Sequence, residues 1–188
     1  MASAERGETR RKMVLGAARL LAKRGLHETS FTQVLELTGA PRGSIYHHFP
    51  GGKEQLVGEA VIAVGSRAVQ LIEDARGSTP VEVTSAFISS WRELLTRYDF
   101  AAGCSVAAVT VATDSDELLE HAATVFRTWR GRLAEALVSV GVAEPQAQRF
   151  AAVLISSAEG AVIVSRAERS IDSFDLVAGY LNEQASAL

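Results

Sequence analysis

The sequence has little of what several protein classes require. It contains one cysteine, four prolines and 6% aromatic residues in 188 positions. The single cysteine, Cys104, excludes an internal disulfide and a cysteine-rich zinc site. Because proline is scarce and no low-complexity run is present, the chain also has no obvious flexible linker.

Segments that would direct the chain to a membrane or out of the cell are missing as well. The N-terminal stretch MASAERGETRRK is basic but lacks the apolar core of a secretion signal. The longest apolar run, from Phe150 to Ser165, is interrupted by Glu159 and flanked by arginines. We expect this run to be too short and too polar to span a bilayer. A cytoplasmic protein that does not associate with membranes is therefore predicted.

Hydrophobic residues, by contrast, are abundant enough for a substantial core. They make up 47% of the chain, and the 22% of charged residues excludes a disordered polyampholyte. Alanine and leucine are frequent and long alternating runs are few, which favours helices over strands. The length suits one ordinary domain or a small module fused to a larger one. We therefore expect an all-α protein.

Charge is distributed unevenly along the chain. The net charge of −3, taken alone, argues against a nucleic-acid binder. Residues 1–53, however, carry nine Lys and Arg against four Asp and Glu, whereas residues 54–188 carry ten against eighteen. A basic end on an acidic body indicates a localised surface that contacts phosphate groups.

The stretch TSFTQVLELTGAPRGSIYHHFPGGK predicts two short helices joined by a tight turn. Ser30 precedes Gln33 by three positions, which is the spacing of a helix-capping box. Gly39 and Pro41 suit the end of the first helix and the first turn of the second. The second helix, from Arg42 to about His48, is too short to be stable alone. We therefore expect a scaffold to hold it and present its exposed side chains to a partner.

The tail of this stretch, GSIYHHFPGGKEQL, resembles the DNA-binding signature of the TetR (tetracycline-repressor-like) family of bacterial transcription regulators. The resemblance implies three N-terminal helices that bind DNA, a connecting fourth helix, and a larger C-terminal domain for ligand binding and dimerisation. We accordingly expect a helix-turn-helix domain at residues 7–53, a connecting helix from about 53 to 76, and an effector-binding and dimerisation domain at residues 77–188. Helical patterns predict about nine helices in all, and we interpret the ambiguous residues 101–113 as a loop and a short helix.

In a helix-turn-helix, the second helix enters the major groove with its N-terminal residues at the base edges. Arg42 is the only residue of that helix able to make a bidentate contact with guanine. Tyr46 suits a phosphate contact, as the resemblance also implies, although a core position with its hydroxyl at the surface is an alternative. The expected DNA contacts are Thr32, Gln33, Pro41, Arg42, Gly43, Ser44, Tyr46, His47 and Lys53. Because so short a helix contacts few bases, we expect a homodimer on a pseudo-palindromic operator in double-stranded DNA.

The segment AAVLISSAEGAVIVSRAE is apolar on more than one helical face. A helix that is apolar all round must be buried, so one face can serve its own core and another a partner chain. With the last helix, this suggests a four-helix interface around a twofold axis, and a central helix in a monomeric bundle is the alternative. The residues that we assign to the dimer interface are Ala151, Leu154, Ala158, Ala161, Val162 and Tyr180.

Aromatic residues of the C-terminal part lie on two predicted helices that flank the small, apolar segment GCSVAAVTVA. Large rings packed against small side chains can leave a cavity, although such rings more often form plain core. The segment resembles GCPVAAV of the LmrA/YxaF-like branch of the family, with Ser105 in place of proline, and this implies a response to small lipophilic compounds. Glu159 lies in the most apolar helix, where it can orient a ligand or pair with an arginine. The residues that we assign to effector binding are Phe87, Trp91, Cys104, Phe126, Trp129 and Glu159.

Other interpretations are less favoured by the residues. Adjacent histidines such as His47 and His48 point about 100° apart on a helix, which disfavours a metal site. An enzyme with Cys104 as nucleophile and His121 as base would need a group that activates the thiol, and no such motif flanks it. We expect no catalytic residue, no metal and no cofactor. The favoured hypothesis is a repressor released from its operator by a small lipophilic effector, and the alternative is an effector-independent regulator or activator that works through a protein partner.

Overall fold

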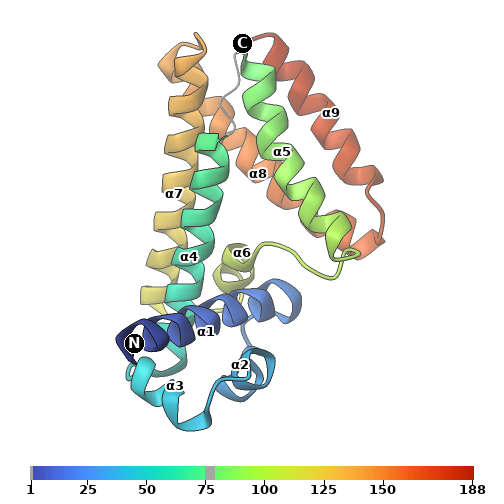
Figure 1. Cartoon of the computed structure of the whole chain (residues 1–188). Coiled ribbons are helices and arrows are strands. Elements are labelled where there is room, and N and C mark those ends of the chain that lie inside the picture. The colour runs from blue at the N-terminus through green and yellow to red at the C-terminus, as the bar shows by residue number, and fades with distance from the viewer. Residues whose placement is uncertain (1, 75–78) are drawn as a thin grey trace. The chain divides into compact units, whose positions relative to one another are not determined.

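The computed structural model of the protein describes residues 2–74 and 79–188, with side chains from residue 6 onward. Within these residues the chain has nine helices and no strand, which confirms the predicted all-α class (Figure 1). The helices are α1 (Ala2–Arg24), α2 (Phe31–Thr38), α3 (Arg42–His48), α4 (Gly52–Asp74), α5 (Pro80–Arg97), α6 (Ser105–Thr110), α7 (Asp116–Ser139), α8 (Glu144–Glu168) and α9 (Asp172–Ser186). The ambiguous segment at residues 101–113 is indeed a loop followed by the short helix α6.

Contacts within the chain divide it into two compact units. The first unit contains the residues up to Gly65 together with Cys104–Val125, and the second contains Ser66–Gly103 and Phe126–Leu188. Helices α4 and α7 therefore contribute residues to both units. The predicted domain boundary at residues 76 and 77 lies outside the described residues. The sequence pattern did not indicate that Cys104–Val125 packs with the N-terminal helices.

Local signals define the ends of the first three helices. Helix α1 begins at Ala2. The alanine, glutamate and arginine residues of its first turns have high intrinsic helix propensity. The predicted capping box at the start of α2 is confirmed: the backbone N–H of Gln33 donates to Ser30 Oγ over 3.3 Å, and the Ser30 N–H donates to Gln33 Oε1 over 3.1 Å. Gly39 then adopts a left-handed φ of 68° and ends the helix.

The second unit has a three-helix layer of α5, α8 and α9, which pack on one another. A capping box starts α5, because the Thr79 hydroxyl accepts from the Glu82 N–H over 3.2 Å and the Glu82 carboxylate accepts from the Thr79 N–H over 3.2 Å. Arg92 of α5 forms a bidentate ion pair with Asp175 of α9, with both N···O distances 2.9 Å. This pairing helps to set the position of α9 along α5.

Two helices of the structure, α4 and α8, are long and apolar enough to cross a membrane by length and composition. This corrects the expectation that the apolar run around Glu159 is too short, because α8 extends well beyond that run on both sides. About two fifths of each apolar window, 39% in α4 and 44% in α8, is buried inside the protein. Core helices of soluble proteins pass the same test, so the two helices are weak evidence for a membrane protein.

In the first unit, α4 and α7 approach each other at glycines. A Cβ added at Gly58 would lie 2.6 Å from Nδ1 of His121, and one added at Gly65 would lie 2.6 and 2.9 Å from the two γ-carbons of Val125. Contacts this short do not occur between real side chains, so any larger residue at either position displaces α7 or its side chains. The absence of a side chain at Gly58 and Gly65 therefore sets the spacing of the two helices.

Gly65→Ala is expected to lower the free energy of unfolding by about 1–2 kcal/mol, since overpacking outweighs the helix propensity gained. The buried, β-branched Val125 cannot turn away from the new methyl group. The measurement is chemical unfolding followed by circular dichroism. Gly131→Ala in α7 is the matched control, because its Cβ meets nothing within 4 Å, and it is expected to stabilise the protein. Equal stabilisation by both substitutions would contradict the proposed close contact.

Candidate nucleic-acid interface and ligand cavities

Helix α3 has one face in the core and one in solvent. Ile45 and Phe49, four residues apart, are inaccessible to solvent, so two apolar side chains anchor a helix of only seven residues. The outer face carries the predicted reader residues: Arg42, Gly43, Tyr46 and His47 are exposed and Ser44 is half-buried. The structure therefore brings together on one surface the residues that the sequence predicted to meet DNA.

Tyr46 lies at the surface and not in the core. Its side chain is 70% exposed, which removes the alternative of a core aromatic. The ring makes an edge-to-face contact with Phe31 of α2, with ring centroids 5.5 Å apart. Because this contact restricts the ring, the hydroxyl is held at the same face as Arg42 without being buried.

Some of the predicted DNA contacts are already used within the fold. The Ser44 hydroxyl donates to the Pro41 carbonyl over 2.7 Å, and the Gln33 carbonyl oxygen accepts the capping bonds of Ser30. Thr32 and Pro41 are exposed. Ser44 and Gln33 therefore stabilise the two helix starts in the free protein, and of this group Thr32 has the most accessible hydroxyl.

Lys53, predicted to contact the DNA backbone, points toward its own chain. Its Nζ donates to the Leu26 carbonyl over 2.8 Å, and burial lowers the pKa of the ammonium group. The bond ties the start of α4 to the segment between α1 and α2. Of the three N–H donors, one is engaged in this way and two remain for a phosphate.

A polar cluster that the sequence did not predict braces α3. Arg10 of α1 forms an ion pair with Glu59 of α4 over 2.5 Å, and Gln55 donates to the same carboxylate oxygen over 3.0 Å. The Arg10 guanidinium also lies over the Phe49 ring, 5.2 Å from its centroid, which is cation–π geometry. These contacts hold α1, α4 and the end of α3 together, so the cluster positions the reader helix.

His48 lies beside this brace and is half-buried. Burial lowers its pKa, and the positive charges of His47, Arg10 and Arg6 lower it further. The lowered pKa favours the neutral imidazole, so His48 adds less charge to the DNA-facing surface than a free histidine would.

In the second unit, the predicted effector aromatics form one continuous packed row. Trp91 lies between Phe87 and Trp129, at centroid distances of 6.3 and 6.2 Å, and Trp129 contacts Phe126 at 5.5 Å. All three contacts are edge-to-face. Phe87, Trp91 and Trp129 are buried, so most of the row is core. The Trp91 Nε1–H is buried and has no hydrogen-bond partner among the residues that the structure describes.

A cavity of about 280 Å³ lies at the open end of this row. It brings together two of the predicted effector residues, Phe126 of α7 and Glu159 of α8, with Arg130 as a cationic neighbour. The other residues of its lining are Ala152, Ile155 and Ser156. The mixture of apolar surface with one arginine and one carboxylate suits a small lipophilic molecule with a polar group.

Cys104 belongs to the first unit and is not among the residues that line that cavity. Its sulfur accepts from the Ala107 N–H over 3.4 Å and caps α6. The side chain is 8% exposed. The structure thus gives Cys104 a capping role, and its assignment to the effector site stays a prediction.

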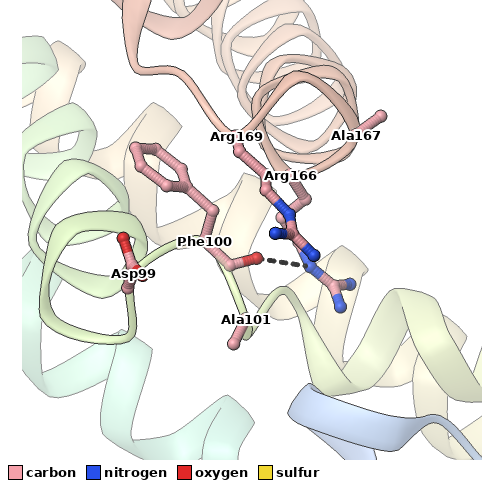
Figure 2. A pocket seen from close by; sticks show the side chains of 6 residues that line it. All are labelled: Asp99, Phe100, Ala101, Arg166, Ala167 and Arg169. Carbon is pink, nitrogen blue, oxygen red and sulfur yellow. Dashed lines mark hydrogen bonds between the residues drawn. The ribbon is translucent and has the colours of Figure 1, made fainter.

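Two further cavities occur among the described residues of the second unit. One, of about 390 Å³, lies between Ile72 at the end of α4 and the last turns of α7, with Arg132 and Glu135 in its wall. The other, of about 550 Å³, is lined by residues 99–101 after α5 and by Arg166, Ala167 and Arg169 at the end of α8 (Figure 2). The sequence did not predict either of them, since each is formed by segments far apart in the chain.

The predicted dimer residues require a correction. Five of them are at most 4% exposed and belong to the core of the protomer: Ala151, Leu154, Ala158, Ala161 and Val162. They pack inside their own unit and have no surface to offer a partner. The opposite face of α8 carries Val153, Ile163 and Val164, which are 51%, 59% and 44% exposed. Of the predicted set, Tyr180 on α9 remains accessible, at 59%.

Comparison with known proteins places these features in context. Residues 14–60 match the family model of "Bacterial regulatory proteins, tetR family", and residues 80–180 match that of "Transcriptional regulator LmrA/YxaF-like, C-terminal domain". A similar protein, an HTH-type transcriptional regulator of Mycobacterium tuberculosis, is 37% identical over 89% of both chains. The Bacillus subtilis regulators YxaF and LmrA are 34% and 31% identical, each over 85% of this chain and over 86% and 87% of their own.

Solved structures share the fold. A TetR regulatory protein from Rhodobacter sphaeroides has a TM-score of 0.82 at 20% identity, covering 92% of this chain and 96% of its own. A TetR transcriptional regulator from Legionella pneumophila also has a TM-score of 0.82, at 18% identity, with 93% and 95% covered. At these identities the likeness extends to the fold alone.

Proposed function

Since this chain belongs to the TetR family of bacterial DNA-binding transcription regulators, a non-enzymatic family, we propose that it is a homodimeric, cytoplasmic repressor released from its operator by a small lipophilic effector. The observation that carries the DNA-binding part is the outer face of α3. Arg42, Tyr46 and His47 lie there in solvent while Ile45 and Phe49 anchor the helix in the core. A guanidinium group at the start of an exposed helix is suited to a guanine edge in the major groove.

Dimerisation is supported by the uncovered apolar face of α8 and α9. This face comprises Val153, Ile163, Val164, Leu176 and Tyr180, each at least 44% exposed. Gly160 of α8 is exposed, and a Cβ there would meet nothing within 4 Å. A helix of a second copy therefore has room to approach α8 closely. Packing two copies of this face about a twofold axis would give two α3 helices, one for each half of a pseudo-palindromic operator.

Effector binding is supported by the cavity beside Phe126. Its volume of about 280 Å³ suits a small ligand, and it lies at the end of the aromatic row that contains Trp91. The unsatisfied Nε1–H of Trp91 is a donor that a polar group of a ligand can satisfy if the row rearranges. Leaving such a donor unpaired costs about 1–3 kcal/mol, so a ligand that accepts from it gains affinity.

Coupling between ligand and DNA is expected to run along α7. This helix supplies Phe126 to the cavity, and in the first unit it contacts α4 through His121 on Gly58 and Val125 on Gly65. Helix α4 in turn carries Glu59, which pairs with Arg10 in the brace that positions α3. A coupling free energy of about 1–3 kcal/mol would change operator affinity by roughly 5-fold to 150-fold.

The test is fluorescence anisotropy of the purified protein on DNA from the region upstream of its own gene, across a salt series. We expect saturable binding that weakens steeply with salt. A panel of small lipophilic compounds is then added to the complex, and a member that fills the cavity is expected to release the DNA. Ile155→Trp, which fills the cavity wall, should remove this response while operator binding remains.

The possible results separate the parts of the proposal. Binding no tighter than to random DNA of equal length, across the upstream region, would contradict a specific operator there. A stable complex that no compound releases would favour the effector-independent alternative. Release that is unchanged in Ile155→Trp would show that the cavity beside Phe126 is not the effector site.

A further inference from the structure

The cavity of about 550 Å³ at the ends of α5 and α8 is not explained by DNA binding or by the proposed effector site. Two short segments form it. Asp99, Phe100 and Ala101 follow α5, and Arg166, Ala167 and Arg169 end α8. Its volume is in the range of small-molecule sites, so the chemistry of its wall decides what it can bind.

Two guanidinium groups line this cavity without a carboxylate partner. Arg166 Nε donates to the Phe100 carbonyl over 3.4 Å, and Figure 2 shows both arginine side chains reaching from α8 toward that carbonyl. No acidic side chain in the described part of the chain forms an ion pair with either. Asp99 also lines the cavity, but in Figure 2 its carboxylate lies apart from the two guanidinium groups. Like charges facing one cavity repel, and an anion between them would relieve the repulsion.

The backbone around this cavity is held in unusual conformations. Asp99, Phe100 and Arg169 have positive φ angles of 47°, 58° and 51°, and no other non-glycine residue in the described ranges does. Such backbone conformations are strained, and residues of this kind cluster at binding sites. All three lie in the wall of one cavity, which is where a ligand would benefit from a fixed backbone.

Gly103 makes room for the Arg166 side chain. A Cβ at this position would lie 2.9 Å from Nη1 and 3.0 Å from Cδ of Arg166. Arginines near a helix C-terminus are favoured by the helix dipole alone, and this accounts for two cations at the end of α8. It does not account for the direction of Arg166, whose guanidinium turns to the Phe100 carbonyl of another segment.

We propose that this cavity binds a small organic monocarboxylate with an apolar body. A planar carboxylate can accept two parallel hydrogen bonds from a guanidinium group, and Arg166 keeps the four N–H donors of its two Nη atoms beyond the one that Nε gives to Phe100. Phe100, Ala101 and Ala167 supply apolar contact. Two arginines and one aspartate leave a single net positive charge in the wall, which favours a monoanion over a dianion. The site goes beyond the proposed function and does not depend on it.

The test adds benzoate, its neutral analogue benzamide or inorganic phosphate to the full-length protein without DNA. Saturation-transfer difference NMR measures the binding of benzoate and benzamide, and competition with benzoate measures the binding of phosphate. We expect saturable binding of benzoate at millimolar concentration. Benzamide should bind at least about tenfold more weakly because it lacks the charge that strengthens the hydrogen bonds, and phosphate at least about tenfold more weakly because it lacks an apolar body. Arg166→Gln and Arg169→Gln should each weaken benzoate binding by about tenfold.

Two matched controls locate the site. Arg149→Gln removes an exposed arginine of the same helix away from the cavity, and Arg130→Gln removes the arginine of the cavity beside Phe126; both should leave benzoate affinity unchanged. Equal binding of benzoate and benzamide, loss of binding in either control, phosphate binding as tight as benzoate, or no saturation at millimolar benzoate would each overturn the proposal. Thermal unfolding of every variant verifies that it is folded.

Discussion

Arg42→Ala is expected to weaken binding to the specific operator by about 30-fold to 20,000-fold, since a bidentate base contact contributes about 1–3 kcal/mol and the proposed dimer has two. Arg42 is exposed at the start of α3 and is not one of the buried anchor residues, so the substitution removes a DNA contact without disturbing the core. Binding to random DNA should fall much less. The measurement is the ratio of specific to random affinity at one salt concentration, by fluorescence anisotropy.

Arg42→Lys is the informative control for this result. Lysine keeps the positive charge but loses the planar fork that matches guanine. If Arg42 reads a base, Arg42→Lys should lose most of the specificity ratio. If operator binding by Arg42→Lys equals that of the unmodified protein, Arg42 contacts phosphate and the assignment as base reader is wrong. Thermal unfolding should be unchanged in both variants, because substitutions at exposed positions usually alter stability by less than about 0.5 kcal/mol.

Trp129→Ala is expected to lower the free energy of unfolding by about 3–5 kcal/mol. The side chain is 1% exposed and contacts both Trp91 and Phe126 through its ring. Removing it opens a large void in the aromatic row that the surrounding helices cannot fill. For a protein of this size the loss corresponds to a fall in Tm of roughly 6–20 °C. The measurement is thermal unfolding at one fixed protein concentration, because a dimer's Tm depends on concentration.

Val111→Ala provides the comparison, since Val111 is 82% exposed and lies after α6 in the other unit. It should change stability by less than about 0.5 kcal/mol. Trp129→Phe retains a ring and should cost less than the alanine variant. A loss of stability smaller than about 1 kcal/mol for Trp129→Ala would mean that the aromatic row is loosely packed. The wall of the proposed ligand cavity beside Phe126 would then be mobile.

The features that sequence reasoning predicted well are those carried by neighbouring residues. The capping box of Ser30 and Gln33, the turn at Gly39 and the short reader helix after Pro41 all depend on interactions within a few positions. The capping box of Thr79 and Glu82 at the start of α5 depends on an equally local interaction. Such signals act through local backbone geometry, so a single sequence contains them in full.

Features that depend on distant residues could not be predicted in this way. Helical periodicity shows that α8 has two apolar faces, but which face meets the protomer's own core depends on α5 and α9, and the assignment of Ala151, Leu154 and Ala158 to a partner was therefore reversed. Lys53 carries a typical phosphate-binding side chain, yet its position next to the Leu26 carbonyl directs it inward. Neither outcome is encoded in local spacing.

The sequence by itself determined the all-α class, the basic N-terminal part and the helix-turn-helix with Arg42 and Tyr46 on its second helix. These follow from composition, from charge counts and from short-range capping and turn signals. Only the tertiary structure decided that Glu59 and Arg10 brace the reader helix, that Phe126 and Glu159 share a cavity, and that Arg166 and Arg169 face a second one. The physical reason is that ion pairs and cavities form between side chains brought together by packing, and their positions along the chain do not reveal which of them meet.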